Sequence, residues 1–357
     1  MHAFNSLTLI SHVTIFLMLV EDPDFSWNTG CLMLVVAQRK SRLQREYWMV
    51  VKFLRPNAFN LDNMREQLIE IKQDMPGFNP FFGSWMCRDD LNILIDVGPA
   101  NTANRLIDSL VSIGLGRVDY VLITHIHIDH GGALADLLDY YPMAKAICHE
   151  KGIKHLMDPS NLWTGSLSVL GDLARSYGPP KPVSRERLIP HTECNLKDLM
   201  VIETPGHALH HLSYSYKGRL FVGEAAGNYL DVNGLDYLRP ATPPRFFLDL
   251  FLKSIDRLLA LEDQPIRYAH FGEAANSHRM LNIFRDQLIL WEAIIGKMVR
   301  KGADSEDIIR GCIDLLLEKD PNLAAFNIMD SDIQARERFF MANGVRGFVE
   351  FLKEKKP

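Results

Sequence analysis

The chain of 357 residues has few cysteines and no long hydrophobic run, and these two features argue against a disulfide-rich secreted protein and a membrane-spanning protein. Its five cysteines are scattered, odd in number and never spaced Cys-x-x-Cys, which is typical of reduced thiols in the cytoplasm. The apolar run at residues 7–20 is shorter than the roughly 20 residues that span a bilayer. We therefore expect a cytoplasmic protein with no stable membrane insertion.

The chain also lacks an excess of charge of either sign. Lys and Arg number 39 against 44 Asp and Glu, a formal net charge of −5, so there is no electrostatic signature for nucleic acid and we expect no such partner. Internal repeats, long low-complexity tracts and glycine-rich phosphate loops are absent as well. Hydrophobic residues make up 47%, enough to bury the core of one large or two modest domains.

What the chain does contain is a dense group of metal-type ligands directly after the apolar run at residues 120–124. The group consists of His125, His127, Asp129 and His130. The run predicts a buried strand, and open α/β folds place their sites at the carboxyl ends of such strands. His125 and His127, two residues apart, can converge on one ion, while Asp129 and His130 lie past the turn and can face a second.

Three further candidate ligands each follow a strand-like segment downstream. The runs at 199–203, 219–223 and 266–269 lead into His207 (after Pro205-Gly206), Glu224 and His270. Taken singly, a buried histidine is more often part of a core than a ligand. The ordered set instead favours metal binding.

This order of motifs resembles the metallo-β-lactamase superfamily, whose pattern is His-x-His-x-Asp-His, a Pro-Gly-His, a Gly-Asp and a late His. The resemblance covers roughly residues 90–272 and includes Ile95-Asp96-Val97-Gly98, similar to the early Ile-Asp-x-Gly of the family. It implies an α/β fold, a four-layer αββα sandwich of the metallo-β-lactamase type. It also implies two ion sites: one of His125, His127 and His207, the other of Asp129, His130 and His270, with Glu224 bridging them.

Two positions depart from the family pattern. Glu224 stands where Asp is usual, and its extra methylene lengthens the reach by about 1.5 Å. Either the backbone retracts, or the carboxylate binds one ion more than the other, or it binds none. His210-His211 stands where many relatives carry Gly-His; we interpret His211 as supporting the ligands or filling the core, and leave His210 unassigned.

The resemblance implies a metal-dependent hydrolase with two divalent ions, zinc before manganese or iron, and a small-molecule substrate. Such ions acidify a bound water, and Asp129 would orient that water and pass on its proton as the catalytic residue. An ester, thioester, lactone, amide or phosphoester is the substrate class. The hydroxyacylglutathione-hydrolase-like branch is the suspected one, although no glutathione pocket can be read from the sequence. A quorum-type lactonase is disfavoured, because Gly227 replaces the tyrosine of those enzymes, although Tyr229 lies nearby.

Two other functions stay open. A mononuclear-iron oxidoreductase resembling persulfide dioxygenases would use His125, His207 and Glu224 as a two-histidine, one-carboxylate set. It ranks second because it leaves the other four ligand-type residues without a metal. A non-enzymatic metal-binding module ranks third.

The remaining pattern predicts three regions. Residues 1–48 are expected to form a poorly packed extension. Met49 is an alternative start, because residues 49–54 read as an opening strand, and with that start the extension would not be native. Residues 49–273 form the catalytic domain, with strands at 91–95, 118–123 and 144–148, helices at 102–113 and 133–140, and a helical insertion near 160–178. Residues 274–357 form a helical extension with helices at 280–299, 305–319 and 333–355, broken at Pro321 and Gly344, which packs on the core or forms a homodimer contact.

Two segments are candidates for the substrate pocket. The insertion near 160–178 could cover the metal site, with Trp163 and Tyr177 either facing substrate or packing in the core. The segment 238–246 is a second candidate wall. Arg239 or Arg245 could grip an anionic substrate there, or pair with a carboxylate of the chain.

Overall fold

The computed structural model describes residues 66–300 and 306–355, except the side chains of 307 and 308, together with the backbone of four earlier strands. These strands, β1 (Asn5–Ser6), β2 (Val13–Met18), β3 (Leu32–Arg39) and β4 (Tyr47–Leu54), form an antiparallel sheet in chain order. The chain divides into two units, Met1–Arg65 and Glu66–Pro357. The opening strand expected at residues 49–54 lies within β4. The described residues do not test the predicted packing of residues 1–48 or the predicted start at Met49.

The first sheet of the second unit has six strands in the order β10-β9-β8-β7-β6-β5. They are β5 (Glu66–Glu70), β6 (Gly83–Arg88), β7 (Asn92–Ile95), β8 (Tyr120–Leu122), β9 (Lys145–Cys148) and β10 (Leu188–Pro190). Strands β7 to β10 run parallel, so their carboxyl ends share one edge of the sheet. The three strands predicted in this region are confirmed, each slightly shorter than the apolar run that predicted it.

The second sheet has five strands in the order β11-β12-β13-β16-β17. They are β11 (Leu199–Glu203), β12 (Leu212–Tyr216), β13 (Arg219–Gly223), β16 (Ile266–Tyr268) and β17 (Glu273–Ala274). Trp85, Leu122, Tyr214 and Phe221 fill the space between the two sheets. The Trp85 Nε1–H also donates to the Tyr268 carbonyl at 2.9 Å, which ties one sheet to the other.

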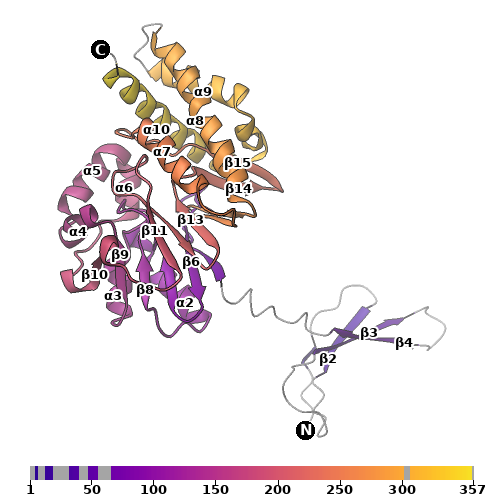
Figure 1. Ribbon diagram of the computed structural model, residues 1–357. Coiled ribbons are helices and arrows are strands. Elements are labelled where there is room, and N and C mark those ends of the chain that lie inside the picture. The colour runs from indigo at the N-terminus through magenta and orange to yellow at the C-terminus, as the bar shows by residue number, and fades with distance from the viewer. Residues whose placement is uncertain are drawn as a thin grey trace. The chain divides into compact units, whose positions relative to one another are not determined.

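Helices cover the outer face of each sheet (Figure 1). Over the first lie α2 (Ala103–Ser112), α3 (Leu134–Tyr140), α4 (Glu150–Met157), α5 (Ser160–Leu170) and α6 (Asp172–Tyr177), and over the second α7 (Leu248–Leu259) and α8 (Ser277–Arg300). In α7 the residues Leu248, Phe251, Ile255 and Leu258 recur at helical spacing and all are buried. The predicted four-layer αββα sandwich is therefore confirmed.

Short elements complete the chain: 3₁₀ turns at η1 (Ala100–Thr102), η2 (Arg185–Arg187) and η3 (His191–Glu193), and a hairpin of β14 (Asn228–Val232) and β15 (Leu235–Arg239). The predicted insertion is two helices, α5 and α6, because Gly171 between them adopts a φ of +57°. Four cysteines, Cys87, Cys148, Cys194 and Cys312, form no disulfide, as expected; Cys31 lies outside the described residues.

The carboxyl-terminal region is helical, as predicted, with α8, α9 (Glu306–Lys319), η4 (Pro321–Ile328) and α10 (Ser331–Glu354). Pro321 ends α9 as expected, but the prediction that Gly344 breaks a helix is wrong, because α10 continues through it. Glycine is used in α10 for close packing: a Cβ at Gly347 would lie 2.1 Å from the Thr242 carbonyl oxygen. Among the described helices, none is long and apolar enough to cross a membrane.

Candidate metal centre

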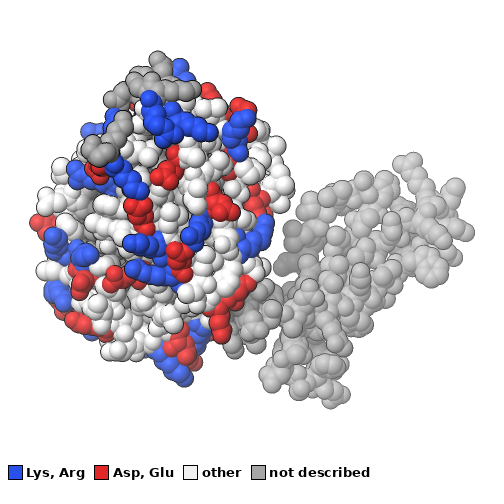
Figure 2. Space-filling view, turned by 45° about the horizontal axis from the view of Figure 1, so that its top comes forward, with Lys and Arg blue, Asp and Glu red and all other residues white. Residues whose placement is uncertain are grey.

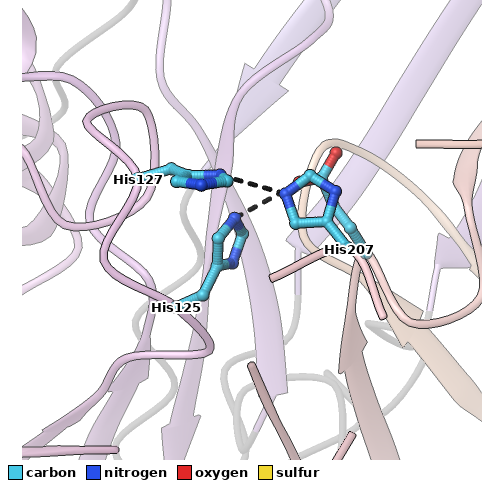
Figure 3. Close-up of side chains that lie close together, drawn as sticks. His125, His127 and His207 are labelled. Atoms are coloured by element: carbon cyan, nitrogen blue, oxygen red, sulfur yellow. Dashed lines mark hydrogen bonds and ion pairs between the residues drawn. The ribbon is translucent and has the colours of Figure 1, made fainter. Parts of the chain in front are cut away.

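The structure brings together all seven residues that the sequence singled out. His125, His127, Asp129 and His130 lie on the loop after β8, His207 follows β11, Glu224 follows β13, and His270 follows β16. Each of these side chains therefore follows the end of a strand, and both sheets contribute to the cluster. Figure 3 shows the rings of His125, His127 and His207 turned toward one another.

The side chains form two groups. In the first, the ligand-type atoms of His125, His127, His207 and Glu224 lie within 4.8 Å of one another; in the second, those of Asp129, His130 and His270 do. These are the two sets that the family resemblance implied.

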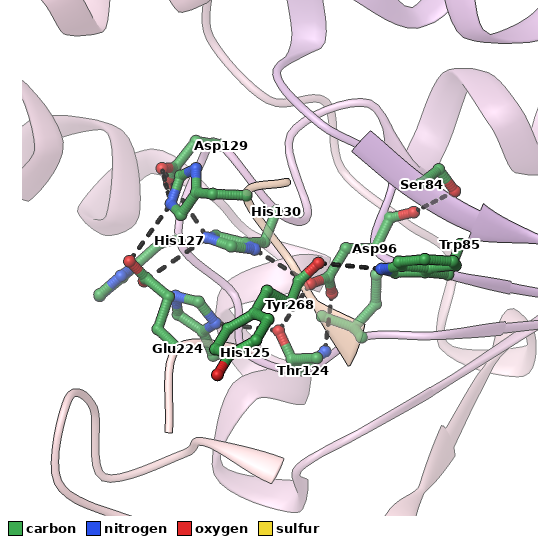
Figure 4. Close-up of polar contacts among 12 residues, drawn as sticks. Ser84, Trp85, Asp96, Thr124, His125, His127, Asp129, His130, Glu224 and Tyr268 are labelled. Atoms are coloured by element: carbon green, nitrogen blue, oxygen red, sulfur yellow. Dashed lines mark hydrogen bonds and ion pairs between the residues drawn. The ribbon is translucent and has the colours of Figure 1, made fainter. Parts of the chain in front are cut away.

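The Glu224 carboxylate touches both groups (Figure 4). Its Oε2 lies 2.8 Å from His207 Nε2, 3.3 Å from His125 Nε2 and 3.6 Å from His130 Nε2. Its Oε1 lies 3.2 Å from His270 Nε2. The longer side chain at this position thus still reaches both sets of ligands.

Three of the histidines are held in the tautomer that metal binding needs. The Nδ1–H of His130 donates to Asp96 Oδ2 at 3.0 Å. That of His207 donates to the Ala241 carbonyl at 2.9 Å, and that of His125 to Thr124 Oγ1 at 3.1 Å. Each Nε2 is then directed toward the centre, where that of His207 lies 3.0 Å from His127 Nδ1. The Nε2 atoms of His125 and His130 are buried and have no hydrogen-bond partner. Imidazoles oriented in this way, together with carboxylates, fit divalent metal ions.

Asp96 organises this arrangement from the end of β7. Its Oδ1 accepts the Thr124 backbone N–H at 2.8 Å, and its Oδ2 accepts the Thr124 hydroxyl at 2.7 Å as well as the His130 ring. Asp96 itself is 1% exposed. The sequence contained Asp96 only as part of a family motif, and its hydrogen bonds explain why an acid is needed there.

His211 and Gly223 place the backbone of Glu224. His211 Nε2 accepts the Glu224 N–H at 3.1 Å, while its Nδ1–H donates to Thr204 Oγ1 at 2.8 Å. Gly223 has a φ of +55° and sits at an irregularity of β13, where a Cβ would come within 2.6 Å of His211 Nε2.

Burial and neighbouring charges shift the pKa values of four of these groups, and three of the shifts favour the form that binds metal. Burial lowers the pKa of His125 and of His127 well below 6.5, so both rings are neutral. Burial acts in the same direction on His130, but Asp129 and Asp96 outweigh it and raise the pKa of His130 well above 6.5. Burial would raise the pKa of Glu224; the neighbouring histidines, His207 first, outweigh it and hold that pKa well below 4.5. Glu224 is therefore ionised.

A cavity of about 640 Å³ opens over these groups, a volume suited to a small molecule. Its lining includes His127, Asp129, His207, Glu224 and His270 from the ligand groups; Leu162, Gly165, Val169 and Leu170 from α5; residues 241–245 and Phe247; and Phe340, Asn343 and Gly344 from α10. The candidate wall at 238–246 thus contributes to the cavity. Trp163 and Tyr177 do not line it: Trp163 packs against the core and Tyr177 is fully buried.

A third group, His149, His191 and Glu203, was not expected from the sequence. His149 Nδ1 accepts the Lys151 N–H at 3.1 Å, His191 Nδ1 accepts the Glu150 N–H at 3.3 Å, and His191 Nε2 donates to Glu203 at 3.0 Å. Because both Nδ1 atoms accept, the Nε2 atoms carry the hydrogens and have no lone pair for a metal. This group caps α4 and is structural.

Comparison with known proteins agrees with this geometry. The sequence model of the metallo-β-lactamase superfamily matches residues 84–272. A metallo-β-lactamase fold-containing protein of the archaeon Sulfurisphaera tokodaii is 32% identical over 202 residues, covering 52% of this chain and 71% of that protein. The hydroxyacylglutathione hydrolase of Aeromonas salmonicida is 28% identical over 224 residues, covering 62% and 74%. The chain belongs to the metallo-β-lactamase superfamily.

Solved structures show the same fold. A metallo-β-lactamase superfamily protein from Sulfolobus tokodaii superposes with a TM-score of 0.59 at 23% identity, over 81% of this chain and 98% of that one. A metallo-β-lactamase family protein from Thermus thermophilus superposes with a TM-score of 0.56 at 18% identity, over 82% and 94%. Both extend beyond the residues that the family pattern covers, so the likeness includes part of the carboxyl-terminal region.

Proposed function

We propose that this protein is a dinuclear metal-dependent hydrolase that cleaves an ester or thioester of a small molecule in the cytoplasm. The observation that carries the proposal is the position of Glu224, whose two carboxylate oxygens lie against histidines of both ligand groups. Zinc is the favoured metal because the sets combine imidazole and carboxylate ligands, with manganese or iron as alternatives. The hydroxyacylglutathione hydrolases among the relatives favour a thioester, while lactone, amide and phosphoester bonds belong to the same reaction class.

Each residue has a distinct part in the proposal. His125, His127 and His207 would hold one ion and Asp129, His130 and His270 the other, while Glu224 has one carboxylate oxygen against each group. Bound ions of this kind acidify water and polarise a carbonyl oxygen.

Asp129 is the proposed catalytic residue. Its Oδ2 lies 3.8 Å from both His130 Nε2 and His270 Nε2, and its side chain is 16% exposed toward the cavity that it lines. From there the carboxylate can orient a water molecule and carry a proton to the leaving group.

The proposal includes a small-molecule substrate and no nucleic-acid partner. Figure 2 supports the second point: on the face that it displays, Lys and Arg are interspersed with Asp and Glu and form no field of one sign. Assembly into a homodimer stays a prediction.

The mononuclear-iron alternative uses only His125, His207 and Glu224. It leaves Asp129, His130 and His270 without a role, although their ligand-type atoms lie within 4.8 Å of one another and His130 is oriented by Asp96. The second group is therefore what favours two ions over one.

Metal analysis of protein purified without chelator tests the proposal directly. We expect two zinc or manganese ions per chain, hydrolysis of at least one member of a panel of thioesters, lactones and phosphodiesters, loss of that activity on chelation and its return on reloading. We expect His127→Ala to lower kcat/KM by at least about 100-fold. His278→Ala, at a histidine outside the cavity lining, is the matched control. One iron per chain with oxygen uptake, and activity retained in His127→Ala, would overturn the proposal.

A further inference from the structure

One wall of the cavity carries a buried arginine with a free hydrogen-bonding group. Arg239, at the end of β15, is 2% exposed and lines the cavity. Its Nε donates to Glu337 Oε2, and its Nη1 makes a long contact of 3.5 Å to the Pro240 carbonyl. Its Nη2 is buried and has no hydrogen-bond partner. A buried guanidinium nitrogen without a partner is costly unless something else satisfies it.

The hydrogen-bonded triad of Arg239, Glu337 and Arg336 also has an excess of positive charge, and Glu224 is the next carboxylate that acts on Arg239. Glu337 is shared by two guanidinium groups, since Arg336 Nε donates to its Oε1 at 2.8 Å. Burial would raise the pKa of Glu337, but Arg239 and Arg336 outweigh it and hold that pKa at about 2, so the carboxylate is ionised. Two cations against one anion leave this triad with a net charge of +1. Arg336 Nη1 already donates to the carbonyls of Gly77 and Pro80, so the donor without an acceptor belongs to Arg239.

Neighbouring side chains hold Arg239 in place beside the metal centre. Phe340 of α10 packs against the guanidinium, 4.9 Å from ring centroid to Cζ. Phe340 stacks on Phe81 at 5.4 Å, and Phe81 stacks on His270 at 4.4 Å. The arginine therefore lies on the side of the cavity that holds the second ligand group.

Asn228 adds a second polar group at the same place. It is paired in register with Arg239 across the β14–β15 hairpin, which puts both side chains on one face. Asn228 is 6% exposed, lines the cavity, and has an Oδ1 without a partner. Rotation of its amide would present the NH₂ group instead. The wall thus offers donors that the chain itself does not use.

The second arginine in the cavity lining, Arg245, differs from Arg239 in its exposure. Arg245 is exposed and lies at the rim. The opposite wall, from α5, is apolar, with Leu162, Val169 and Leu170. A substrate matched to this cavity has an apolar part and one anionic group.

We propose that the substrate is an ester or thioester that carries a separate carboxylate, and that this carboxylate accepts a hydrogen bond from Arg239 Nη2 while the apolar part lies against α5. The inference rests on the proposed hydrolase function. A carboxylate fits better than a phosphate, because its single negative charge matches the net charge of +1 on the triad, whereas a phosphate monoester carries about −1.5 to −2 at pH 7. Arg239 is on this basis a substrate-binding residue that selects by charge.

Matched esters test the inference on the wild-type, metal-loaded protein. The first pair is mono-4-nitrophenyl glutarate and 4-nitrophenyl pentanoate, which differ by a carboxylate for a methyl group on the acyl side. The second pair, 4-carboxyphenyl butanoate and phenyl butanoate, places the carboxylate on the leaving group. We expect the carboxylate member of one pair to have a kcat/KM about tenfold higher or more, mainly through KM, the size of one charge-assisted hydrogen bond.

Two variants assign the effect. Arg239→Met keeps the apolar stem against Phe340 and leaves Glu337 paired with Arg336, so we expect the ratio of kcat/KM within the pair to fall to about one. Arg245→Met, which removes the rim cation, should keep the ratio. Loss of the preference in Arg245→Met but not in Arg239→Met would overturn the assignment. The wild-type comparison stands without either variant if one of them does not fold.

Calorimetric binding of glutarate and pentanoate gives a readout that does not depend on turnover. We expect glutarate to bind wild type about tenfold more tightly than pentanoate and to lose that advantage in Arg239→Met. If kcat/KM is equal for the two members of both ester pairs, and glutarate and pentanoate bind equally tightly, the inference is overturned while the hydrolase proposal stays intact. A glutarate preference without hydrolysis of any ester supports the carboxylate site while counting against the proposed reaction. Tighter binding of inorganic phosphate than of glutarate overturns the choice of a carboxylate.

Discussion

At the scale of single residues, the candidate metal centre depends on side chains outside the two ligand-type groups. Asp96 has a φ of +54°, a backbone region that Asp tolerates better than most residues, and this conformation ends β7 next to Thr124. From there one carboxylate accepts three hydrogen bonds, two from Thr124 and one from His130. All three are donated to it, so an acceptor-only group is what the position requires.

Asp96→Asn tests this role. Asn fits the same backbone, but its NH₂ group must face one of the three donors, so His130 or Thr124 loses its orientation. We expect metal affinity to fall about 10- to 100-fold, measured by competition with a chromogenic chelator. The exposed Asp108→Asn on α2 is the control and should keep wild-type affinity. Unchanged affinity in Asp96→Asn would show that Asp96 does not orient the ligands.

At the scale of elements, α5 forms a cover rather than a core helix. It has no fully buried residue, and Leu162, Leu167 and Leu170 pack only partly against the core. Its cavity-facing side includes Gly165, where an added Cβ would meet nothing within 4 Å. A glycine in the exposed interior of a helix costs about 1 kcal/mol relative to Ala, so the sequence keeps open space here at the expense of stability.

Two variants, Gly165→Leu and Gly165→Ala, distinguish an effect on the volume of the cavity from an effect on the free energy of unfolding. Both should raise the free energy of unfolding by about 0.5–1 kcal/mol in denaturant titrations, because both remove the glycine. Only Leu should fill the cavity, and we expect it to raise KM at least about threefold for esters with long acyl chains while acetyl esters change little. If Leu and Ala give the same KM for long chains, α5 does not bound the substrate.

At the scale of the whole second unit, α10 is part of the site rather than an appendage. Arg336 donates to carbonyls of residues 77 and 80, Glu337 pairs with Arg239, and Gly347 lets α10 approach the Thr242 carbonyl. The helix therefore joins the start of the first sheet to the loop after the β14–β15 hairpin. It also places Phe340 and Asn343 in the cavity lining.

The pH dependence of the free energy of unfolding tests the ion pairs that Glu337 of α10 makes with Arg239 and Arg336. The pKa of Glu337 is lowered in the folded state to about 2, from 4.5, so its contribution is complete above pH 4.5 and is lost as pH falls through 2. The contribution is on the order of 3 kcal/mol at 1.36 kcal/mol per pKa unit. We expect the difference in unfolding free energy between wild type and Glu337→Gln to shrink by that amount between pH 4.5 and 2, whereas the exposed Glu318→Gln shows no such change. Parallel curves for wild type and Glu337→Gln would show that Glu337 is not held ionised.

Much of this could be predicted from the sequence, for physical reasons that differ between features. Strands, helices and the two-sheet fold follow from local periodicity, and the ends of the strands were misplaced by one or two residues because the flanking apolar residues continue into loops. Gly344 was misread as a breaker, since a helical glycine that allows close packing looks the same in sequence as one that ends a helix.

Which side chains are available as candidate ligands follows from the sequence alone, because their spacing within residues 125–130 and their places after apolar runs are local properties. Three features become visible only in the folded chain: Glu224 reaches both ligand-type groups, Asp96 and His211 orient members of those groups, and Arg239 keeps one nitrogen without a partner beside the shared Glu337. Those facts depend on two sheets packing face to face and on a helix that returns from residues 331–354. No local pattern encodes contacts between residues so far apart in the chain, and hydrogen-bond geometry exists only once they meet.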